Sequence, residues 1–463
     1  MKKIATLCLG FLSTLFATAQ GPGPIQQISI GNTLVTIDTV YTGLDIPWEI
    51  TPYNGQLWVT ERHGIVSRIN PQDHTRTVLL DLTAQVTQSG EGGLLGMALH
   101  PNFDSVPRVF LVYTYGPANN MLEKLVRFDF ANNALTNEVV LIDNIPAYSS
   151  HNGSRLLFLP DSTLLMSTGD AQQQSTPQNL GSLNGKILRV NMDGTIPADN
   201  PFSESLVYSY GHRNVQGMVR LPNGRIYISE HGPSNDDEFQ ELLPGRNYGW
   251  PNVEGYCNTP AEMTFCSNND IQEPVMTWTP TIAPADMAYY SNPAFPEFDG
   301  SILMAVLKEK KVIALKLNNT GDAVLGDEDY LTNSIGRIRD VAVGASQEIY
   351  FATNGPNANN DQPNTHSIIA IYPPTSLGVA EITNPDIKIS PNPVVNTLNV
   401  DFAKNPDYPV TLKIVSMAGQ IIQQEDLSLQ ATAVDVSKLT QGWYAVSMEK
   451  KGEVIFQTKI YRN

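Results

Sequence analysis

A short β-rich run recurs six times along the chain, and this repeat restricts the fold more than any other feature. The runs are LWVTE from Leu57, VFLVYT from Val109, LLMSTG from Leu164, IYISEH from Ile226, ILMAVL from Ile302 and IYFATN from Ile349. Successive runs begin 52, 55, 62, 76 and 47 residues apart, and no long stretch shows a sustained helical period. Repeats of about 40–50 residues with several strands each are typical of a β-propeller, so we expect an all-β fold with six blades.

Further strands of the blades are visible downstream. Five of the six runs have a second apolar run after them, which is VSRIN at Val66, LVRFDF at Leu125, KILRVN at Lys186, KVIALKL at Lys311 or SIIAIY at Ser367. A β-sandwich of similar size is the alternative, but it would not need a recurring strand–turn–strand unit. The inner strands of a propeller line a central channel, and loops at one face bind ligands. We therefore expect function in the insertions, above all between Ile226 and Ile302.

The N-terminus has the pattern of an export signal. Two lysines precede an apolar stretch over residues 4–16, and the segment ATA over 17–19 suits signal peptidase. We expect residues 1–19 to be removed, leaving a propeller domain over 20–373 and no transmembrane segment, because no stretch is long and apolar enough to span a bilayer. A membrane anchor is the alternative. The net charge of −17 disfavours nucleic acid and anionic membranes as partners.

The cysteines fit an exported protein. Cys8 falls in the export signal, which leaves Cys257 and Cys266 in an oxidising compartment where such a pair usually bonds. We expect one disulfide, closed around a loop that reads NTPAEMTF. A metal pair is the alternative, but two thiols without a nearby His make a poor zinc site.

The pattern changes near Pro373. We expect a linker over 374–386 and a small immunoglobulin-like β-sandwich over 387–463. Its short alternating runs are IKISPNP from Ile387, LNVDF from Leu398, VTLKIVS from Val410, VDVSKL from Val434, WYAVSM from Trp443 and FQTKIY from Phe456. A carbohydrate-binding sandwich is the alternative, and its candidate aromatic residues are Tyr408, Trp443, Tyr444 and Tyr461.

Three motifs in this segment carry a resemblance. SPNP with a following LNV, KIVSMAGQII and SKLTQGWYAVSM resemble the C-terminal sorting domain of the type IX secretion system, in that order. The resemblance covers Ile387 to Asn463. It implies recognition by the secretion machinery and passage across an outer membrane, followed by cleavage of this domain or attachment to the cell surface.

Two motifs of the propeller place polar groups beside apolar strands. SSHNGSRLLF contains His151 and Arg155, and a His before a Gly-containing turn can project into a channel and act as a base near neutral pH. A lone His is more often structural. YGHRNVQG contains His212, Arg213 and Asn214, which need partners if they are buried. They can equally cap a loop.

A third motif is acidic. In SEHGPSNDDEF, the carboxylates of Asp236, Asp237 and Glu238 beside Gly232 and Pro233 suggest a hard cation held by carboxylates and carbonyls. The spacing does not fit an EF-hand loop, and a solvated acidic turn is the alternative.

A fourth group is cationic. Lys308 is followed by Arg337 and Arg339, and in so acidic a chain these cations on consecutive blades suit an anionic ligand. Arg337 and Arg339 are two residues apart, so they share a face if the segment is a strand.

Taken together, these segments resemble the soluble quinoprotein glucose/sorbosone dehydrogenases from about Leu44 to Ile371. The shared motifs, in family order, are IPWEI, GEGGLLGMALHPNF, HNGSRL, GHRNVQG, EHGPSNDDE with NYGWP, PTIAP, and a Lys followed after 29 residues by Arg-x-Arg. The resemblance implies a six-bladed propeller that binds pyrroloquinoline quinone and calcium. It also implies oxidation of an aldose or a related sugar alcohol group by hydride transfer, with an external electron acceptor.

The resemblance implies roles for individual residues. His151 corresponds to the base that takes the hydroxyl proton of the sugar. Arg213 corresponds to a catalytic contact near the reducible carbonyl of the quinone, and Asn214 to a cofactor contact. Gly232 and Pro233 correspond to the carbonyl donors of the calcium ion that binds the quinone.

It also implies cationic partners for the cofactor's carboxylates, at Lys308, Arg337 and Arg339. Thr281 is a further cofactor candidate. Asp237 and Tyr248 match a neighbouring loop of the family.

The chain departs from the sugar-oxidising members at two positions near the expected substrate. Glu91 stands where they carry Gln, and a carboxylate near an anionic cofactor is unfavourable unless it is protonated or paired. Ser150 stands where they carry Asp, and that loss would weaken the orientation of His151 or change the substrate. Two other functions therefore stay open. They are a non-catalytic propeller that binds a protein or glycan partner, and a calcium-dependent lactonase or hydrolase on a similar propeller.

Overall fold

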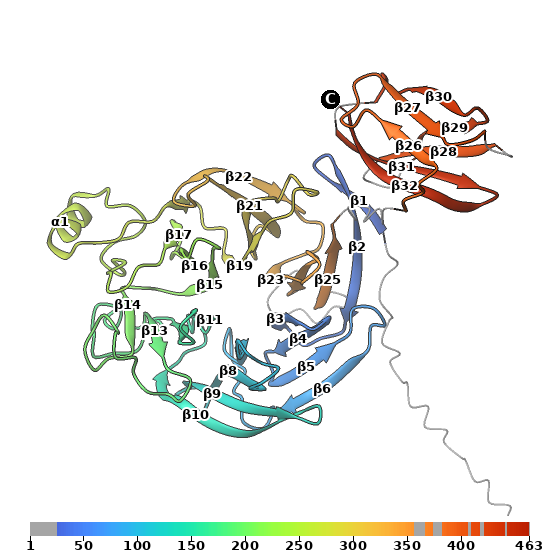
Figure 1. Ribbon diagram of the computed structural model, residues 1–463. Coiled ribbons are helices and arrows are strands. Elements are labelled where there is room, and N and C mark those ends of the chain that lie inside the picture. The colour runs from blue at the N-terminus through green and yellow to red at the C-terminus, as the bar shows by residue number, and fades with distance from the viewer. Residues whose placement is uncertain are drawn as a thin grey trace, which may run out of the picture.

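The structure is a computed structural model that describes residues 26–355, 366–373, 382–405, 409–416, 421–439 and 442–462. The predicted export signal over 1–19, with Cys8, lies outside these residues, as do Tyr408 and most of the predicted linker. Within the described ranges, no helix is long and apolar enough to cross a membrane. Figure 1 shows a ring of small sheets and a second, smaller body of strands.

Six antiparallel sheets form the ring (Figure 1). The first three blades are β3 (Pro47–Tyr53), β4 (Gln56–Glu61), β5 (Ile65–Ile69) and β6 (Arg76–Asp81); β7 (Leu94–Leu99), β8 (Arg108–Tyr115), β9 (Leu122–Ala131) and β10 (Ala134–Pro146); β11 (Leu156–Phe158), β12 (Leu164–Thr168), β13 (Lys186–Val190) and β14 (Val207–Tyr210). The fourth and fifth are β15 (Val215–Arg220), β16 (Ile226–Glu230), β17 (Asp237–Glu241) and β18 (Met276–Trp278); β19 (Pro284–Tyr290), β20 (Ser301–Val306), β21 (Lys311–Leu317) and β22 (Val324–Tyr330).

The sixth blade closes the ring with strands from both ends of the propeller. It consists of β23 (Ile338–Val343), β24 (Ile349–Thr353), β25 (Ser367–Tyr372), β2 (Thr33–Thr42) and β1 (Gln26–Ile30). The innermost strands contact one another in the order β3, β7, β11, β15, β19 and β23, and β23 contacts β3 again. The predicted six-bladed propeller is confirmed.

The six recurring runs of the sequence are the second strands of the blades, not the first. All six residues of β20 are buried, for example, because this strand lies between two neighbouring strands and two neighbouring blades. Such strands read as continuous apolar runs. The fourth blade lacked a second run in the sequence because its third strand, β17, reads DEFQE.

The long interval before Ile302 contains an element that the sequence analysis did not predict. The segment expected as a loop forms helix α1 (Pro260–Asn269), which begins at a capping box between Thr259 and Glu262. Cys266 lies in this helix and is bonded to Cys257, so the predicted disulfide is confirmed.

The C-terminal body is a two-sheet sandwich. One sheet contains β26 (Ile387–Ser390), β27 (Thr397–Phe402) and β30 (Ala431–Asp435), and the other contains β29 (Ile421–Leu427), β28 (Val410–Ser416), β31 (Gly442–Lys450) and β32 (Glu453–Arg462). The sheets enclose a core of their own, so the predicted sandwich is confirmed. β29 was not predicted, because it reads IIQQEDL and most of its residues are exposed or half-buried. Tyr444 is 7% exposed, which makes it a core residue and not a binding aromatic.

Candidate functional site

Polar side chains from all six blades meet at one end of the propeller axis. In each blade, the first and second strands are antiparallel, so the start of the first strand and the end of the second lie at the same end of the axis. We call the polar residues at these positions the entrance site. Its members are Arg62, Glu91, His151, Asp170, Arg213, Asn214, Gln216, His231, Thr281, Lys308, Arg337 and Arg339.

His151 is held by a buried carboxylate. Its Nδ1 lies 2.8 Å from Oδ1 of Asp170, and the two side chains are 15% and 1% exposed. Because an ionised carboxylate only accepts hydrogen bonds, Nδ1 carries the hydrogen and the lone pair remains on Nε2. Asp170 is fixed in turn, because Trp250 Nε1 donates to its Oδ2 at 2.8 Å and the backbone N–H of Gln172 donates to Oδ1 at 2.7 Å.

His151 is oriented by Asp170, although Ser150 replaces the Asp that sugar-oxidising members carry before this His. The absence of this Asp predicts a weaker orientation of His151 or a changed substrate. In the structure, Asp170 orients the ring, whereas the hydroxyl of Ser150 accepts a hydrogen bond from Gln172. Only the packing of two loops from different strands shows that Asp170 reaches His151, so sequence reasoning had no signal for it.

Arg213 lies over the ring of Trp250, with the guanidinium carbon 5.3 Å from the ring centroid. Its Nη1 donates to the backbone carbonyl of His231 at 3.0 Å, whereas its Nε is buried without a hydrogen-bond partner. Desolvation lowers the pKa of Arg213, and the charges of Asp170 and Glu230 partly offset this effect. A guanidinium that is desolvated and only partly paired is well suited to an anionic or carbonyl ligand.

The buried carboxylate of Glu230 fixes the backbone of the GHRN loop, which contains Arg213 and Asn214. Glu230 accepts hydrogen bonds from the backbone N–H groups of Arg213 and Asn214. Its other oxygen lies 3.0 Å from Nδ1 of His212, and Nε2 of His212 lies 2.8 Å from the hydroxyl of Ser209. Ser209 and His212 are fully buried, so this Ser–His–Glu arrangement is a clamp on the GHRN loop and is closed to substrate.

Asn214 is fully buried and has a free donor. Its Oδ1 accepts from the backbone N–H of Gly153 at 3.2 Å and from Nε2 of Gln216 at 3.0 Å. Its Nδ2 is buried without a partner. An unsatisfied buried donor is destabilising, so such an atom marks a position where a ligand can accept a hydrogen bond.

Arg337 and Arg339 both face Glu91, but not as alternate residues of one strand. Arg337 precedes β23, and a register shift between Ile338 and Asp340 makes Arg339 a bulge residue. Arg339 is 8% exposed and donates from Nη1 to Oε1 of Gln216 at 2.7 Å. Desolvation lowers the pKa of Arg339 to about 9, although the charge of Glu91 opposes this effect. Desolvation also lowers the pKa of Arg337, whose Nε is buried without a partner.

Lys308 and Thr281 form a pair in the fifth blade. Nζ of Lys308 donates to Oγ1 of Thr281 at 3.0 Å, and the Lys308 side chain is exposed. Across the part of the chain that the structure describes, neither residue has a hydrogen bond or an ion pair with Arg337 or Arg339. The predicted cationic trio is therefore one pair of arginines plus one lysine on the neighbouring blade.

Glu91 is paired. Its backbone N–H donates to the carbonyl of Ser149 at 2.7 Å, and its Oε2 accepts from the backbone N–H of His151 at 3.1 Å. Desolvation acts to raise the pKa of Glu91, but the charges of His231 and Arg339 and the bond from His151 outweigh it and hold the pKa below its usual value. Glu91 is therefore an ionised group that anchors the loop of His151.

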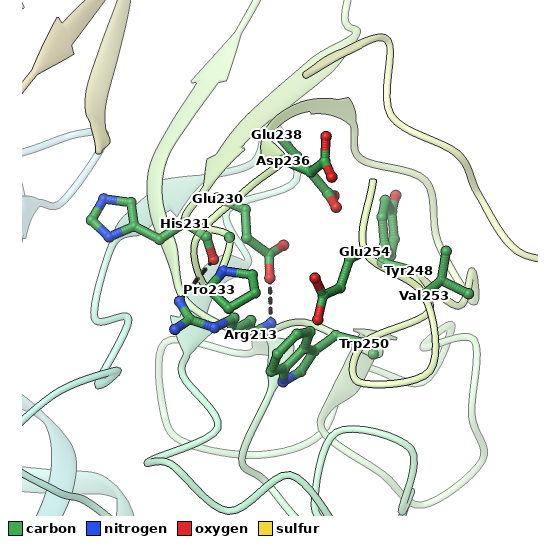
Figure 2. A pocket seen from close by; sticks show the side chains of 12 residues that line it. Arg213, Glu230, His231, Pro233, Asp236, Glu238, Tyr248, Trp250, Val253 and Glu254 are labelled. Carbon is green, nitrogen blue, oxygen red and sulfur yellow. Dashed lines mark hydrogen bonds between the residues drawn. The ribbon is translucent and has the colours of Figure 1, made fainter. Parts of the chain in front are cut away.

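Gly232 and Pro233 line a small pocket together with acidic side chains. Figure 2 shows Glu230, Asp236, Glu238 and Glu254 around this pocket, beside Arg213, Tyr248 and Trp250. A Cβ on Gly232 would lie 2.0 Å from the carbonyl oxygen of Asn235, so glycine is required here. Desolvation, followed by the charge of Glu230, raises the pKa of Glu238 well above its usual value.

Asp237 has a different role from its neighbours in the acidic motif. Its Oδ1 accepts from the backbone N–H of Gly232 at 2.7 Å, and its Oδ2 accepts from those of Ile282 and Ala283 at 2.6 and 2.7 Å. It is 1% exposed. Both oxygens are therefore used to hold two loops together, and the acidic motif offers Asp236 and Glu238 to the pocket instead.

A cluster of charges lies one step deeper along the axis. We call Arg155, Glu49, Asp286 and Asp340 the axial cluster. Arg155 is 2% exposed, and its guanidinium lies 2.5 Å from Glu49, 3.1 Å from Asp286 and 2.9 Å from Asp340. It also lies over the ring of Trp48 at 4.1 Å. Desolvation raises the pKa of Glu49 to about 8 and that of Asp286 well above its usual value, against the charge of Arg155.

The interval between Ile226 and Ile302 contributes several residues to the site, among them Gly232 and Pro233 at the acidic pocket and Trp250 beside Asp170. The chain after β17 runs beside β14, where the backbone N–H groups of Gly245, Tyr248 and Trp250 donate to the third blade or the loop that follows it. This path brings Trp250 to Asp170. The other entrance residues come from the ends of first and second strands. Sequence reasoning also missed Arg62, His231 and Gln216, because short polar strand ends have no periodic signal.

The chain is thus a six-bladed propeller with a cationic, donor-rich entrance beside an oriented histidine. Comparison with known proteins agrees. Residues 44–362 match the glucose/sorbosone dehydrogenase family, and residues 388–462 match the secretion system C-terminal sorting domain. The chain belongs to the glucose/sorbosone dehydrogenase family, a family of oxidoreductases, and ends in a type IX sorting domain.

Individual relatives cover most of the propeller. Aldose sugar dehydrogenase YliI of Escherichia coli is 30% identical over 349 residues, which are 69% of this chain and 90% of the relative. Quinoprotein glucose dehydrogenase B of Acinetobacter calcoaceticus is 27% identical over 448 residues and covers 78% of this chain and 94% of the relative. The structure of the PQQ-bound form of aldose sugar dehydrogenase from Streptomyces coelicolor is similar with a TM-score of 0.64 at 30% identity, over 76% of this chain and 98% of the other.

Proposed function

We propose that this chain is a secreted quinoprotein dehydrogenase that oxidises an aldose or a related sugar alcohol group with pyrroloquinoline quinone and calcium. The observation that carries the proposal is the set of unpartnered donors at the entrance site. Arg62 Nε, Arg213 Nε, Asn214 Nδ2 and Arg337 Nε are buried without hydrogen-bond partners. Each such donor costs about 1–3 kcal/mol, so the site is suited to a flat, anionic ligand rich in acceptors.

The residues present fit that cofactor. Arg213 and Asn214 would hold its carbonyl groups, and Arg337, Arg339 and Lys308 would hold its carboxylates, with Thr281 as a further contact through Lys308. When bound, pyrroloquinoline quinone supplies the two-electron acceptor and calcium supplies Lewis acidity.

The calcium site would use the carbonyl groups of Gly232 and Pro233. The pocket at these residues is lined by the carboxylates of Glu230, Asp236, Glu238 and Glu254, and hard oxygen donors are what Ca²⁺ prefers. A divalent cation there would also offset the electrostatic repulsion that contributes to the raised pKa of Glu238.

His151 would act as the general base. Because Asp170 accepts the hydrogen of Nδ1, Nε2 is free to take the hydroxyl proton of the sugar as the hydride leaves its carbon. Asp170 is then a positioning residue, which stabilises the imidazolium as it forms. Glu91 and Ser150 flank this base and would contact the substrate or its nearest neighbours.

We further propose that the chain is exported by the signal over 1–19 and released or attached at the surface by its sorting domain. An external electron acceptor would then reoxidise the cofactor. Sequencing the N-terminus of the surface and culture fractions checks this route, with Gln20 expected as the first residue.

The decisive experiment is a titration of the mature protein with pyrroloquinoline quinone, with and without calcium, followed by a panel of aldoses. We expect a bound quinone spectrum only with calcium, and bleaching of that spectrum when a sugar is added. A folded protein that binds no quinone would contradict the proposal.

A further inference from the structure

Gln216 joins parts of the entrance site that come from different blades. Its Oε1 accepts from Arg339 in the sixth blade at 2.7 Å, and its Nε2 donates to Oδ1 of Asn214 in the fourth at 3.0 Å. The same oxygen of Asn214 accepts from the backbone N–H of Gly153, two residues after His151, at 3.2 Å. An unbroken line of hydrogen bonds therefore connects Arg339 to the loop of the proposed base.

Two β-bulges create this contact across the axis. In β15, Val215 pairs with Glu230 and Gly217 with Ser229, so Gln216 is the extra residue. In β23, the corresponding extra residue is Arg339. A bulge re-aims the side chain that it carries, and here both side chains are turned toward the axis, where regular alternation would have separated them.

The backbone of Gln216 is fixed from below. Its carbonyl oxygen accepts from Nε of Arg155, 2.9 Å away, and Arg155 is itself held by the carboxylates of the axial cluster. A Cβ on the following residue, Gly217, would lie 2.4 Å from the carbonyl oxygen of Ala285, so the fifth blade approaches closely on this side. The 5% exposed side chain of Gln216 therefore has one available direction.

The chemistry of the two neighbours determines how the amides are oriented. Arg339 is only a donor, so Gln216 must turn its Oε1 to it and its Nε2 to Asn214. Asn214 must then present Oδ1 to Gln216 and Gly153. This leaves Nδ2 of Asn214 as the buried donor without a partner.

We propose that Gln216 is a positioning residue that holds Arg339 in place, fixes which end of the Asn214 amide is offered to the cofactor, and couples both to the loop of His151. Only the identity of the ligand rests on the proposed function. The hydrogen-bond network itself is a property of the protein without cofactor.

Three variants test this role: Gln216→Met, Gln216→Glu and, as a control, Gln240→Met. Met has nearly the volume of Gln but neither hydrogen bond. Glu still accepts from Arg339 but cannot donate to Asn214, so the Asn214 amide should turn its Nδ2 toward position 216. Gln240 is a buried glutamine of the same blade whose amide bonds to Glu238 instead, and because Glu238 lines the acidic pocket, Gln240→Met is the control for the exchange readout alone.

The first readout is amide hydrogen exchange at Gly153 in the protein without cofactor. Because one such bond contributes about 0.5–1.5 kcal/mol, we expect exchange to rise roughly three- to tenfold in both Gln216 variants and to stay unchanged in Gln240→Met. The second readout is the dissociation constant for pyrroloquinoline quinone with calcium. We expect it to rise at least as much, most in Gln216→Glu, where the new carboxylate also neutralises Arg339.

The outcomes separate this proposal from the proposed function. Wild-type exchange at Gly153 in both Gln216 variants would overturn it, as would a uniform rise in exchange over the whole propeller that Gln240→Met reproduces. If the wild-type protein binds no quinone but Gly153 responds only to the Gln216 variants, the network is supported and the proposed function fails.

Discussion

The entrance site and the axial cluster lie next to each other on the propeller axis, and they treat their charges in opposite ways. In the axial cluster, Arg155 is surrounded by Glu49, Asp286 and Asp340, so the guanidinium is fully paired inside the protein. At the entrance site, Arg213 and Arg337 are desolvated but keep buried donors without acceptors. The same residue type is therefore structural at one depth and available for a ligand at the next.

Structural charges and functional charges can be told apart in this way. A paired buried charge stabilises the fold only through its partners, whereas an unpaired buried donor is a cost that a ligand can remove.

The largest effect is expected from Arg155→Met. Removal of the guanidinium leaves three buried carboxyl groups without a cation, so we expect a loss of about 3–5 kcal/mol in the free energy of unfolding. Denaturant unfolding of the purified chain measures it. Arg225→Met is the control, because Arg225 and Glu241 form a more exposed ion pair whose loss should destabilise the fold far less. Equal losses of unfolding free energy in the two variants would show that the axial cluster stabilises the fold no more than an exposed ion pair does.

His151→Ala should affect rate and not stability. Loss of the base should lower kcat by about 10²–10⁴-fold, while the quinone spectrum of the bound form remains. Asp170→Asn should also lower kcat at nearly unchanged quinone affinity, because an amide can donate to Nδ1 and favours the wrong tautomer. Single-turnover bleaching with an aldose measures both, and unchanged rates in His151→Ala would remove His151 from the chemistry.

Arg337→Met should show the reverse of Arg155→Met. The variant loses an unpartnered buried donor, so the melting temperature should stay the same or rise. The dissociation constant for the quinone should rise roughly tenfold or more, because a charged hydrogen bond contributes about 1.5–3 kcal/mol. Calorimetric titration and thermal melting together measure the two effects. A clear drop in melting temperature would show that Arg337 is structural.

The pH dependence of stability is expected to depend on Glu123, a buried carboxyl that accepts a hydrogen bond from the hydroxyl of Ser154. Desolvation raises its pKa from 4.5 to about 8, so the folded state binds a proton that the unfolded state has lost between these values. Its contribution to stability is complete below about pH 4.5 and is lost as the pH rises to about 8. In Glu123→Gln, which keeps a hydrogen-bonding group, the melting temperature should fall less over this interval than in the wild type. Parallel curves would mean that Glu123 is already ionised when folded.

Much of the fold could be predicted from the sequence, because the second strands of all six blades and the third strands of five are largely buried and read as apolar runs. The first strands could not be found in this way, since β15 and β23 mix apolar residues with Gln216, Arg339 and Asp340 and contain bulges. Helix α1 was missed because it has no buried face and therefore no apolar period.

The candidate site could be predicted only where a motif carried it. His151, Arg213, Asn214 and Arg339 were found from their motifs. Asp170 reaches His151 through two loops of the third blade, and Gln216 reaches Arg339 in another blade, so both contacts exist only in the folded chain. Whether the carboxylate of Glu91 is paired also depended on the fold, because its partner is the backbone N–H of His151.

The most direct test of the contrast is a crystal structure of the mature protein with pyrroloquinoline quinone and calcium. We predict that Asn214 Nδ2, Arg213 Nε and Arg337 gain acceptors from the quinone, while Arg155 keeps its carboxylate partners unchanged. A quinone bound elsewhere, or an entrance site whose donors remain unpartnered with quinone present in excess, would contradict the account.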